Sequence, residues 1–482
     1  MGTGLGILAK LAIRMEGASV SGGGLTDSDY PTTPTLANAE EVVLGGSDLV
    51  PFTSESLAAE RNFDYDETLI GKAATINADV VGIMPAGGFE IPAMYDGIDA
   101  ILAAALGFEL PTATDSPVYT SGTALTGAGG MSNNQFIATA GVFAAGDVGK
   151  FIRVTNSTGE GQVRRITVYT NTTTVEVTPI WTTNPVGMTA EMALEFTHTF
   201  ECSNQLKDQL FTAVYAAYPD GGIGVSATDQ IIRRLTVGIE KNQTKPWVYR
   251  SCFVNSLSIT GAAGGGLSIT ADLIPFDEDR DSAPNTASTT WDWDNSSPLF
   301  EANERVMFSD TNYVQVDSYS AATALTSTDN MCVSGFTLNI NNNLKGDDQS
   351  ACTGNYRVEP ARSGMREITG SFTVPRYEAD TWIGWRDSET ILMGIINIEG
   401  STLTNVERGL HLYLNSFKVE SVSVPVGGAS VLTQEVGFRC FIPAGQPKDF
   451  PTNNLTDPRP EITIQTVNQN PFNLFRDQNR EY

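Results

Sequence analysis

The stretch Phe89-Glu90-Ile91-Pro92 is followed by Tyr95-Asp96 and then by a helical pattern. The stretch Phe372-Thr373-Val374-Pro375 has the same sequel, Tyr377-Glu378 and a short helical pattern. Both predict a strand, a proline that stops it and a helix, because proline fits the first helical turn, where no amide hydrogen is needed. This unit decides the fold, and its double occurrence points to an internal duplication.

Further landmarks after this unit also occur twice. Val237-Gly238-Ile239-Glu240 precedes Asn255-Ser256-Leu257, and Ile396-Asn397-Ile398-Glu399 precedes Asn415-Ser416-Phe417. After each Asn-Ser pair we expect a strand, a glycine-containing turn and another strand. Landmarks in the same order predict a duplicated domain. The alternative is two unrelated β-sandwich domains that share common strand and turn chemistry.

The first copy is much longer than the second between its helix and its third strand. Part of the excess contains three strand-like runs joined by turns, at 151–154, 162–169 and 173–181. They predict a small β-domain looped out of a surface connection, where insertions are tolerated. The remaining excess includes a helical stretch, Asn204 to Tyr218.

These landmarks predict an all-β chain of two tandem β-sandwich or half-barrel domains, each with one short helix, plus a small inserted β-domain. The predicted bounds are 1–110 with 193–276 for the first domain, 111–192 for the inserted domain, which projects outward, 277–442 for the second domain and 443–482 for an extended C-terminal arm.

The arm is inferred from a shift to Pro, Asn, Gln and Asp after Ile442, with scattered aromatic residues. We expect Phe450, Phe472 and Phe475 to contact a neighbouring molecule. The alternative is a disordered tail.

The composition supports large cores in a reducing compartment. The 482 residues are 41% hydrophobic, which suits two or three domains. The five cysteines are odd in number, widely spaced and without a Cys-x-x-Cys pair, which argues against a disulfide framework and a zinc site. No window approaches about eighteen uninterrupted apolar residues, so we expect no membrane span.

The charge is strongly acidic. Twenty-nine basic residues stand against 56 acidic ones, a net charge of −27. Such a surface repels nucleic acid rather than binding it. A saline habitat is a competing explanation for the acidity.

No motif indicates catalysis. The two histidines, His198 and His411, lie inside alternating strands, which favours a structural role. The sequence has no Gly-x-Ser-x-Gly elbow and no phosphate-binding loop. Residues 277–281 begin like a calcium loop, but Ser282 and Ser288 replace its required Gly and Glu. We therefore expect no enzyme, no metal site and no cofactor.

Two strands show a sharper alternation, in 52–65 and 333–341. Strand geometry sends Phe63 and Tyr65 to a buried face, and their polar neighbours to a wet face. In the second strand, neutral polar residues alternate with apolar ones in the same way. A half-buried antiparallel sheet explains this alternation, but it does not explain why we find no lysine on the wet face.

With these features, the chain resembles the major tail tube proteins of siphovirus-type tailed viruses. Similarity to that family's N-terminal strand, inner sheet and last strands lies in residues 5–16, 50–57, 239–240, 252–259, 267–273 and 366–374. The inserted domain resembles the decorating domains of virion proteins.

The resemblance implies a structural virion protein that forms stacked rings around a DNA channel. Family members have about four lumen-facing strands per domain and six domains per ring, so two domains per chain imply a trimer. Twenty-four strands about 4.8 Å apart and tilted by about 40° give a backbone diameter of roughly 48 Å. Side chains then leave roughly 38 Å, which exceeds the roughly 20 Å width of duplex DNA.

The resemblance also implies binding partners and a set of residues that line the channel. The partners are further copies of the chain, neighbouring tail proteins and genomic double-stranded DNA, which passes without tight binding. The protein is expected in the virion tail after synthesis in the host cytoplasm. The expected channel lining is Glu60, Asn62, Asp64, Asp66, Thr337, Asn339 and Asn341.

Other functions stay open at this point. A tail terminator, another tail-completion protein or a capsid-surface protein belongs to the same structural class. A carbohydrate-binding adhesin built of β-sandwiches is an alternative from another class. An adhesin predicts a secretion signal and exposed aromatic residues clustered with acids.

Overall fold

The computed structural model describes residues 9–15, 44, 48–66, 77–109, 118–120, 123–128, 132–155, 162–181, 184, 187–202, 234–241, 246–280, 304–349, 357, 360–377, 379–403, 406–426, 431–451 and 460–471. The predicted helical stretch at 204–218 lies outside these residues. So do Phe472 and Phe475.

The chain is all-β, as predicted. Among the described residues, α-helix is confined to α1 (Asp99–Leu106) and α3 (Thr381–Asp387), each after a proline-stopped strand. The strands of the two main domains are β1 (Lys10–Met15), β2 (Leu49–Val50), β3 (Ser54–Glu55), β4 (Ala58–Tyr65), β5 (Ala78–Pro92), β6 (Gly107–Glu109), β7 (Val118–Thr120), β14 (Glu195–Cys202), β15 (Leu235–Glu240), β16 (Trp247–Ala262), β17 (Ser268–Ile274), β18 (Asp277–Asp279), β19 (Thr311–Ser318), β20 (Gly335–Asn341), β21 (Leu344–Lys345), β22 (Ala361–Arg362), β23 (Glu367–Val374), β24 (Leu392–Thr402), β25 (Glu407–Ser423), β26 (Gln434–Cys440) and β27 (Ile462–Asn468).

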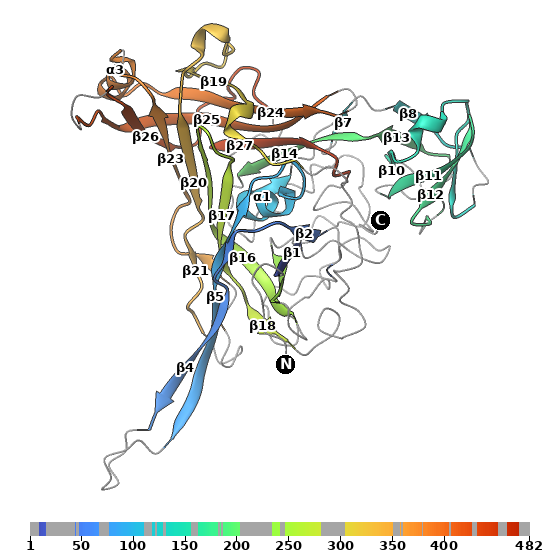
Figure 1. The fold of residues 1–482 in the computed structure, drawn as a ribbon, viewed down its shortest axis with the longest axis horizontal. Helices are drawn as coiled ribbons and strands as arrows, with labels where there is room; N and C mark the ends of the chain where they lie inside the picture. Colours follow the sequence, from blue (N-terminus) through green and yellow to red (C-terminus); the bar gives the residue numbers. More distant parts are fainter. Residues whose placement is uncertain are drawn as a thin grey trace.

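One antiparallel sheet, here called the inner sheet, runs through both copies. Its order is 54–60, β5, β17, β16, β20, β23, β26 and the C-terminal half of β25. The copies meet where β16 pairs with β20, from Ser256 with Asn341 to Ala262 with Gly335. In Figure 1, β5, β17, β16, β20 and β23 run down the left side. Each copy thus contributes four strand segments.

An outer layer crosses the top of Figure 1, in the order β19, β24, β25, β27 and β14. Helix α1 packs between β16 of the inner sheet and β14. Its sequence is rich in alanine and leucine, which favour helix. It ends at Gly107, whose φ of 101° supplies the left-handed cap that stops the helix.

The pairing registers confirm that the copies share one strand order. Equivalent elements are β1 and β19, 54–60 and β20, β5 and β23, α1 and α3, β15 and β24, β16 and β25, β17 and β26, and β18 and β27. Even the β-bulges coincide, because β16 bulges at Asn255 and β25 at Glu420. The match of Asn255 with Asn415 was therefore wrong in register, although it identified the right pair of strands.

The inserted domain is a six-stranded sheet with its own core. Its order is β8 (Thr123–Thr126), β13 (Thr189–Ala193), β10 (Phe151–Val154), β11 (Val163–Asn171), β12 (Thr174–Thr178) and β9 (Gln135–Ile137). Phe136, Phe143 and Trp181 pack at its centre. In Figure 1 it lies at the end of the molecule away from β20 and β23.

The region after Ile442 differs from the expected extended arm. Residues 462–468 form β27, which pairs with β25 of the second copy and with β14 of the first. Since β27 occupies the position of β18, it is the last strand of the second domain. The polar composition of the region hid this strand, because β27 buries Thr463, Thr466 and Asn468 as well as Ile462, Ile464 and Val467.

Candidate functional site

One face of the inner sheet carries mostly hydroxyl side chains. Directly opposed residues of neighbouring antiparallel strands lie on the same face. One row across the sheet reads Glu90, Thr270, Ser258, Asn339, Thr369, Arg439 and Lys418, and the next reads Pro92, Ser268, Thr260, Thr337, Ser371, Gly437 and Ser421. We call this surface the polar face.

The opposite face of the same strands is the core of the molecule. Ile91, Ile269, Ile259 and Leu338 form one row there, each at most 1% exposed. Gly370 continues the row, and a Cβ at this position would lie 2.3 Å from Phe438 Cζ. Glycine therefore lets the Phe438 ring lie across the strand. The tight packing behind the sheet holds the polar face in place.

The polar face is acidic but not free of lysine. Asp272, Glu367 and Glu435 lie on it together with Glu90. Arg439 contacts Glu367 at 2.9 Å, and Lys418 contacts Glu389 at 3.4 Å. The polar positions of β20 carry no lysine, and each of these two cations on β25 and β26 has a carboxylate partner.

The structure divides the residues predicted to line a channel into two groups. Thr337, Asn339 and Asn341 lie on the polar face of β20, while Phe336, Leu338 and Ile340 between them are buried. Glu60 occupies the position equivalent to Asn341, since it pairs with Met84 where Asn341 pairs with Glu367. In the second group, Asn62 and Asp64 lie farther along β4, and Asp66 directly follows it.

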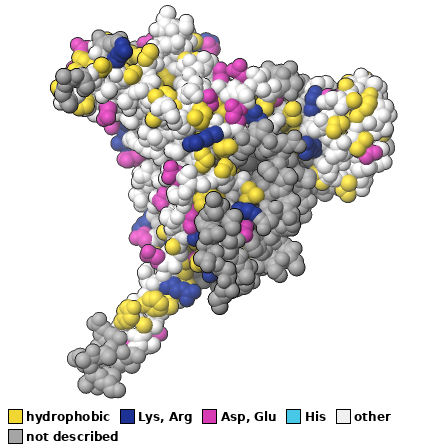
Figure 2. All heavy atoms as spheres, in the orientation of Figure 1, with side chains coloured by type: hydrophobic (Ala, Val, Ile, Leu, Met, Phe, Trp, Pro, Cys, Tyr) yellow, Lys and Arg dark blue, Asp and Glu magenta, His cyan; other side chains and the backbone are white. Residues whose placement is uncertain are grey.

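These three residues belong to a hairpin of β4 and the first half of β5 that projects from the body (Figure 1). Phe63 and Tyr65 are 46% and 55% exposed, so the prediction that they are buried was wrong for a single chain. Their ring centroids lie 6.3 Å apart, and Val81 of β5 is 45% exposed. Figure 2 shows hydrophobic and basic side chains on this projection. Exposed aromatic residues of this kind mark a contact surface.

Sequence reasoning missed most of the polar face. Ser256, Ser258 and Thr260 alternate with Leu257 and Ile259, and β17 alternates in the same way. This period of two was visible in the sequence and could have found these residues. What it could not give was the order of the strands.

Phe450 is buried within its own chain rather than offered to a neighbour. It is 3% exposed, and its ring packs edge-on against Tyr413 of β25, with centroids 5.3 Å apart. The expected contact role of Phe450 therefore does not fit the structure.

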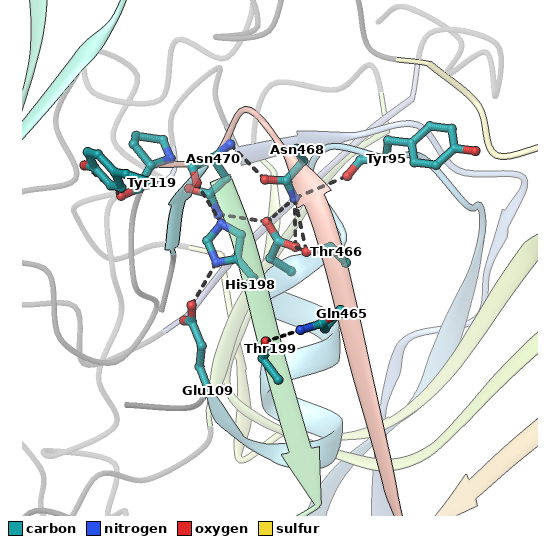
Figure 3. A network of polar contacts seen from close by, with 11 residues as sticks. Tyr95, Glu109, Tyr119, His198, Thr199, Gln465, Thr466, Asn468 and Asn470 are labelled. Carbon is teal, nitrogen blue, oxygen red and sulfur yellow. Dashed lines mark hydrogen bonds and ion pairs between the residues drawn. The ribbon is translucent and has the colours of Figure 1, made fainter. Parts of the chain in front are cut away.

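A buried polar network attaches β27 to the first copy (Figure 3). Asp99 of α1 accepts hydrogen bonds from Thr466 Oγ1 at 2.8 Å, Asn468 Nδ2 at 2.9 Å and Asn470 Nδ2 at 2.8 Å. His198 of β14 lies beside it, with Nδ1 2.8 Å from Glu109 Oε1 and Nε2 2.7 Å from the Asn470 carbonyl oxygen. Carbonyl and carboxylate oxygens accept, so the imidazole donates from both nitrogens and is charged.

Electrostatics agrees with this assignment. Burial alone would lower the pKa of His198, but Asp99 and Glu109, with the two hydrogen bonds, raise it to about 9. The nearby Asp96 has its pKa raised to about 6 by burial, against the lowering effects of the Gln469 amide and Arg408. The network thus joins β27 of the second copy to α1 and β14 of the first.

Neither a metal-binding cluster nor a membrane-spanning helix is found among the described residues. They contain no group of three His, Cys, Asp or Glu side chains placed to hold a metal ion. Within the same part of the chain, no helix has the length and apolar character needed to cross a membrane.

Comparison with known proteins agrees with this arrangement. A family model described as phage tail tube protein matches residues 28–440, which includes strands of both copies and the inserted domain. No curated protein matches the chain. The chain therefore belongs to the phage tail tube protein family.

Proposed function

We propose that three copies of this chain form a ring, that rings stack into a tail tube, and that the polar face lines its DNA channel. The observation that carries this proposal is the junction between the copies. Inside one chain, β16 of the first copy pairs with β20 of the second in a continuous sheet. The same junction repeated between chains closes a cylinder.

The edges left at the two ends of the inner sheet suit such a closure. Beyond Phe417, one edge of β25 has no strand partner among the described residues, and neither has the outer edge of 54–60. Strand equivalence places Ser421 of one copy opposite Glu60 of the next. With eight antiparallel segments per chain, the closing pair is antiparallel too.

The 54–60 edge is capped by side chains in the single chain. The Tyr249 hydroxyl donates to the Leu57 carbonyl oxygen at 2.9 Å, and the Ala59 amide donates to the Glu278 carboxylate. Capped edges resist indiscriminate strand pairing. When the ring closes, hydrogen bonds to the strand of the neighbouring copy replace these two side-chain hydrogen bonds.

The polar face suits a wall along which DNA must slide. A lumen rich in free lysine would bind DNA non-specifically with a dissociation constant of roughly 10⁻⁴ to 10⁻⁶ M in every ring. Hydroxyl groups, acidic side chains and two paired cations give the phosphates little to bind. The inserted domain, at the opposite end of the molecule, then faces outward (Figure 1).

The projecting hairpin supplies a contact between rings. It continues the direction of β5 beyond the body, so it reaches past the edge of its own ring. Burying Phe63 and Tyr65 against another copy stabilises stacking by about 1.5 to 3 kcal/mol per chain. Neighbouring tail proteins then meet the ends of the same tube.

Synthesis in the host cytoplasm fits the cysteines. The four cysteines of the described residues, Cys202, Cys252, Cys332 and Cys440, form no disulfide. Cysteines that stay reduced suit a reducing compartment.

Lysine substitution tests whether the polar face lines the DNA channel. Replacing Ser258, Thr270 and Asn339 by Lys puts three cations in one row of the polar face, where the side chains are exposed or half-buried. We expect rings to assemble and DNA release from triggered virions to slow at least tenfold, because each ring becomes a DNA-binding site. The control replaces Thr126, Thr167 and Thr170, exposed on the inserted domain, by Lys and leaves release unchanged. Equal release rates in both variants would refute the channel assignment.

A further inference from the structure

An open groove lies beside the start of α3, at the end of the second domain's inner sheet. Its volume is about 470 Å³. Its lining includes Met331, Cys332, Val374, Pro375, Trp382 and Gln434. The walls are mainly apolar, and the adjoining Val431 and Tyr377 are 66% and 37% exposed.

The equivalent place in the first domain is filled by the chain itself. Residues 304–308, just before β19, lie between the end of β5 and the start of β17. The Val306 amide donates to the Ala93 carbonyl oxygen at 2.8 Å, and the Leu267 amide donates to the Val306 carbonyl oxygen at 2.9 Å. Val306 is 0% exposed and Phe308 is 9% exposed. We call 304–308 the leader of the second domain.

The leader explains why equivalent positions differ in exposure. In the first domain, Ile91, Ala93, Tyr95 and Leu267 are all at most 1% exposed. In the second domain, Val374 and Leu432 are half-buried, and 375–377 are exposed. The equivalent strands and the proline are present in both domains. What the second domain lacks at this place is a leader segment packed against it.

The order of the domains identifies that leader. The leader of the second domain packs on the domain before it in the chain. Because β1 and β19 are equivalent apart from the extra residue Asn312 in β19, the counterpart of 304–308 lies within residues 1–6. In the proposed ring, the domain next to the first domain on that side is the second domain of another copy.

We propose that the groove beside α3 receives the residues before β1 of the adjacent copy, so that each copy threads its N-terminal segment into its neighbour. This inference rests on the proposed ring and specifies one of its contacts. Leu5 supplies an apolar side chain within this segment for the apolar groove. Ring closure then has two parts, strand pairing in the inner sheet and this docked segment.

Cysteine cross-linking tests the contact, because the exposed thiol of Cys332 already lines the groove. Thr3→Cys and Leu5→Cys are each assembled into tubes, checked by electron microscopy and treated with a short bismaleimide. We expect covalent dimers and closed trimers, with at least tenfold less product when Cys332→Ser is added. The same variants should give no product as dilute unassembled protein, because the acceptor is another copy.

The outcomes separate this inference from the proposed function. Intact tubes without cross-linking from either position overturn the docked segment and leave the tube standing. Wild-type protein that forms no tubes overturns the proposed function itself. If both cysteine variants fail to assemble, hydrogen exchange of wild-type protein decides, since docking predicts at least tenfold slower exchange of the 374–384 amides in tubes than in the protomer. Unchanged exchange there refutes the contact.

Discussion

At the scale of single residues, His198 shows how the chain holds a charge inside a protein core. Its side chain is fully buried, yet both ring nitrogens lie against acceptors, Glu109 and the Asn470 carbonyl group. A folded-state pKa of about 9, above the ordinary 6.5, favours the folded form at low pH. The contribution is fully present below pH 6.5 and is lost as the pH rises through about 9.

His198→Gln should therefore destabilise the protein by an amount that depends on pH. The size of the shift implies on the order of 3 kcal/mol below pH 6.5, where wild-type His198 is charged, and a shrinking difference toward pH 10. Urea unfolding of both proteins between pH 6 and 10 measures it.

His411→Gln is the matched control. Burial lowers the pKa of His411 below its ordinary 6.5, so this residue is mainly neutral above pH 7. Its effect on the free energy of unfolding should be flat from pH 7 to 10. A flat profile for His198→Gln as well would show that His198 is not charged.

At the scale of elements, most strands followed from sequence periodicity and punctuation. The two proline stops placed β5 and β23 and the helices after them. Alternation predicted the burial of β20 residue by residue. The pairing register between strands could not be predicted from the sequence. Bulges at Asn255 and Glu420 shift the strands, and sequence periodicity does not encode such bulges. The hairpin was mispredicted because Phe63 and Tyr65 alternate like core residues, although nothing in the described chain covers them.

The hairpin makes its own prediction. Phe63→Ser with Tyr65→Ser should leave the melting temperature of the protomer within about 1 °C, because both rings are already exposed. Tube assembly should need at least tenfold more protein, because the rings no longer bury apolar area between copies. Light scattering against protein concentration measures this threshold.

Two exposed apolar residues of the inserted domain serve as the comparison. Val168→Ser with Ile180→Ser removes side chains that are 45% and 59% exposed but lie away from the hairpin. The assembly threshold should not change in this variant. If it rises as much as in the hairpin variant, general surface hydrophobicity drives assembly and the hairpin has no special part.

At the scale of the whole molecule, the duplication gives one chain the layout of two adjacent subunits. The contacts between copies, β16 with β20, the leader on Ala93 and Leu267, and β27 on α1, form inside the chain. The first two of these contacts leave their counterparts open at the two ends of the chain. The duplication was predictable from repeated motifs, but these contacts were not, since they join residues far apart in sequence.

Cryo-electron microscopy of tubes assembled from the purified protein tests the central claim most directly. The account predicts hollow tubes of three-copy rings, with the rows through Ser258, Thr270 and Asn339 facing the lumen and the inserted domain on the outer surface. A tube in which these rows face outward, or lie buried between copies, would contradict it.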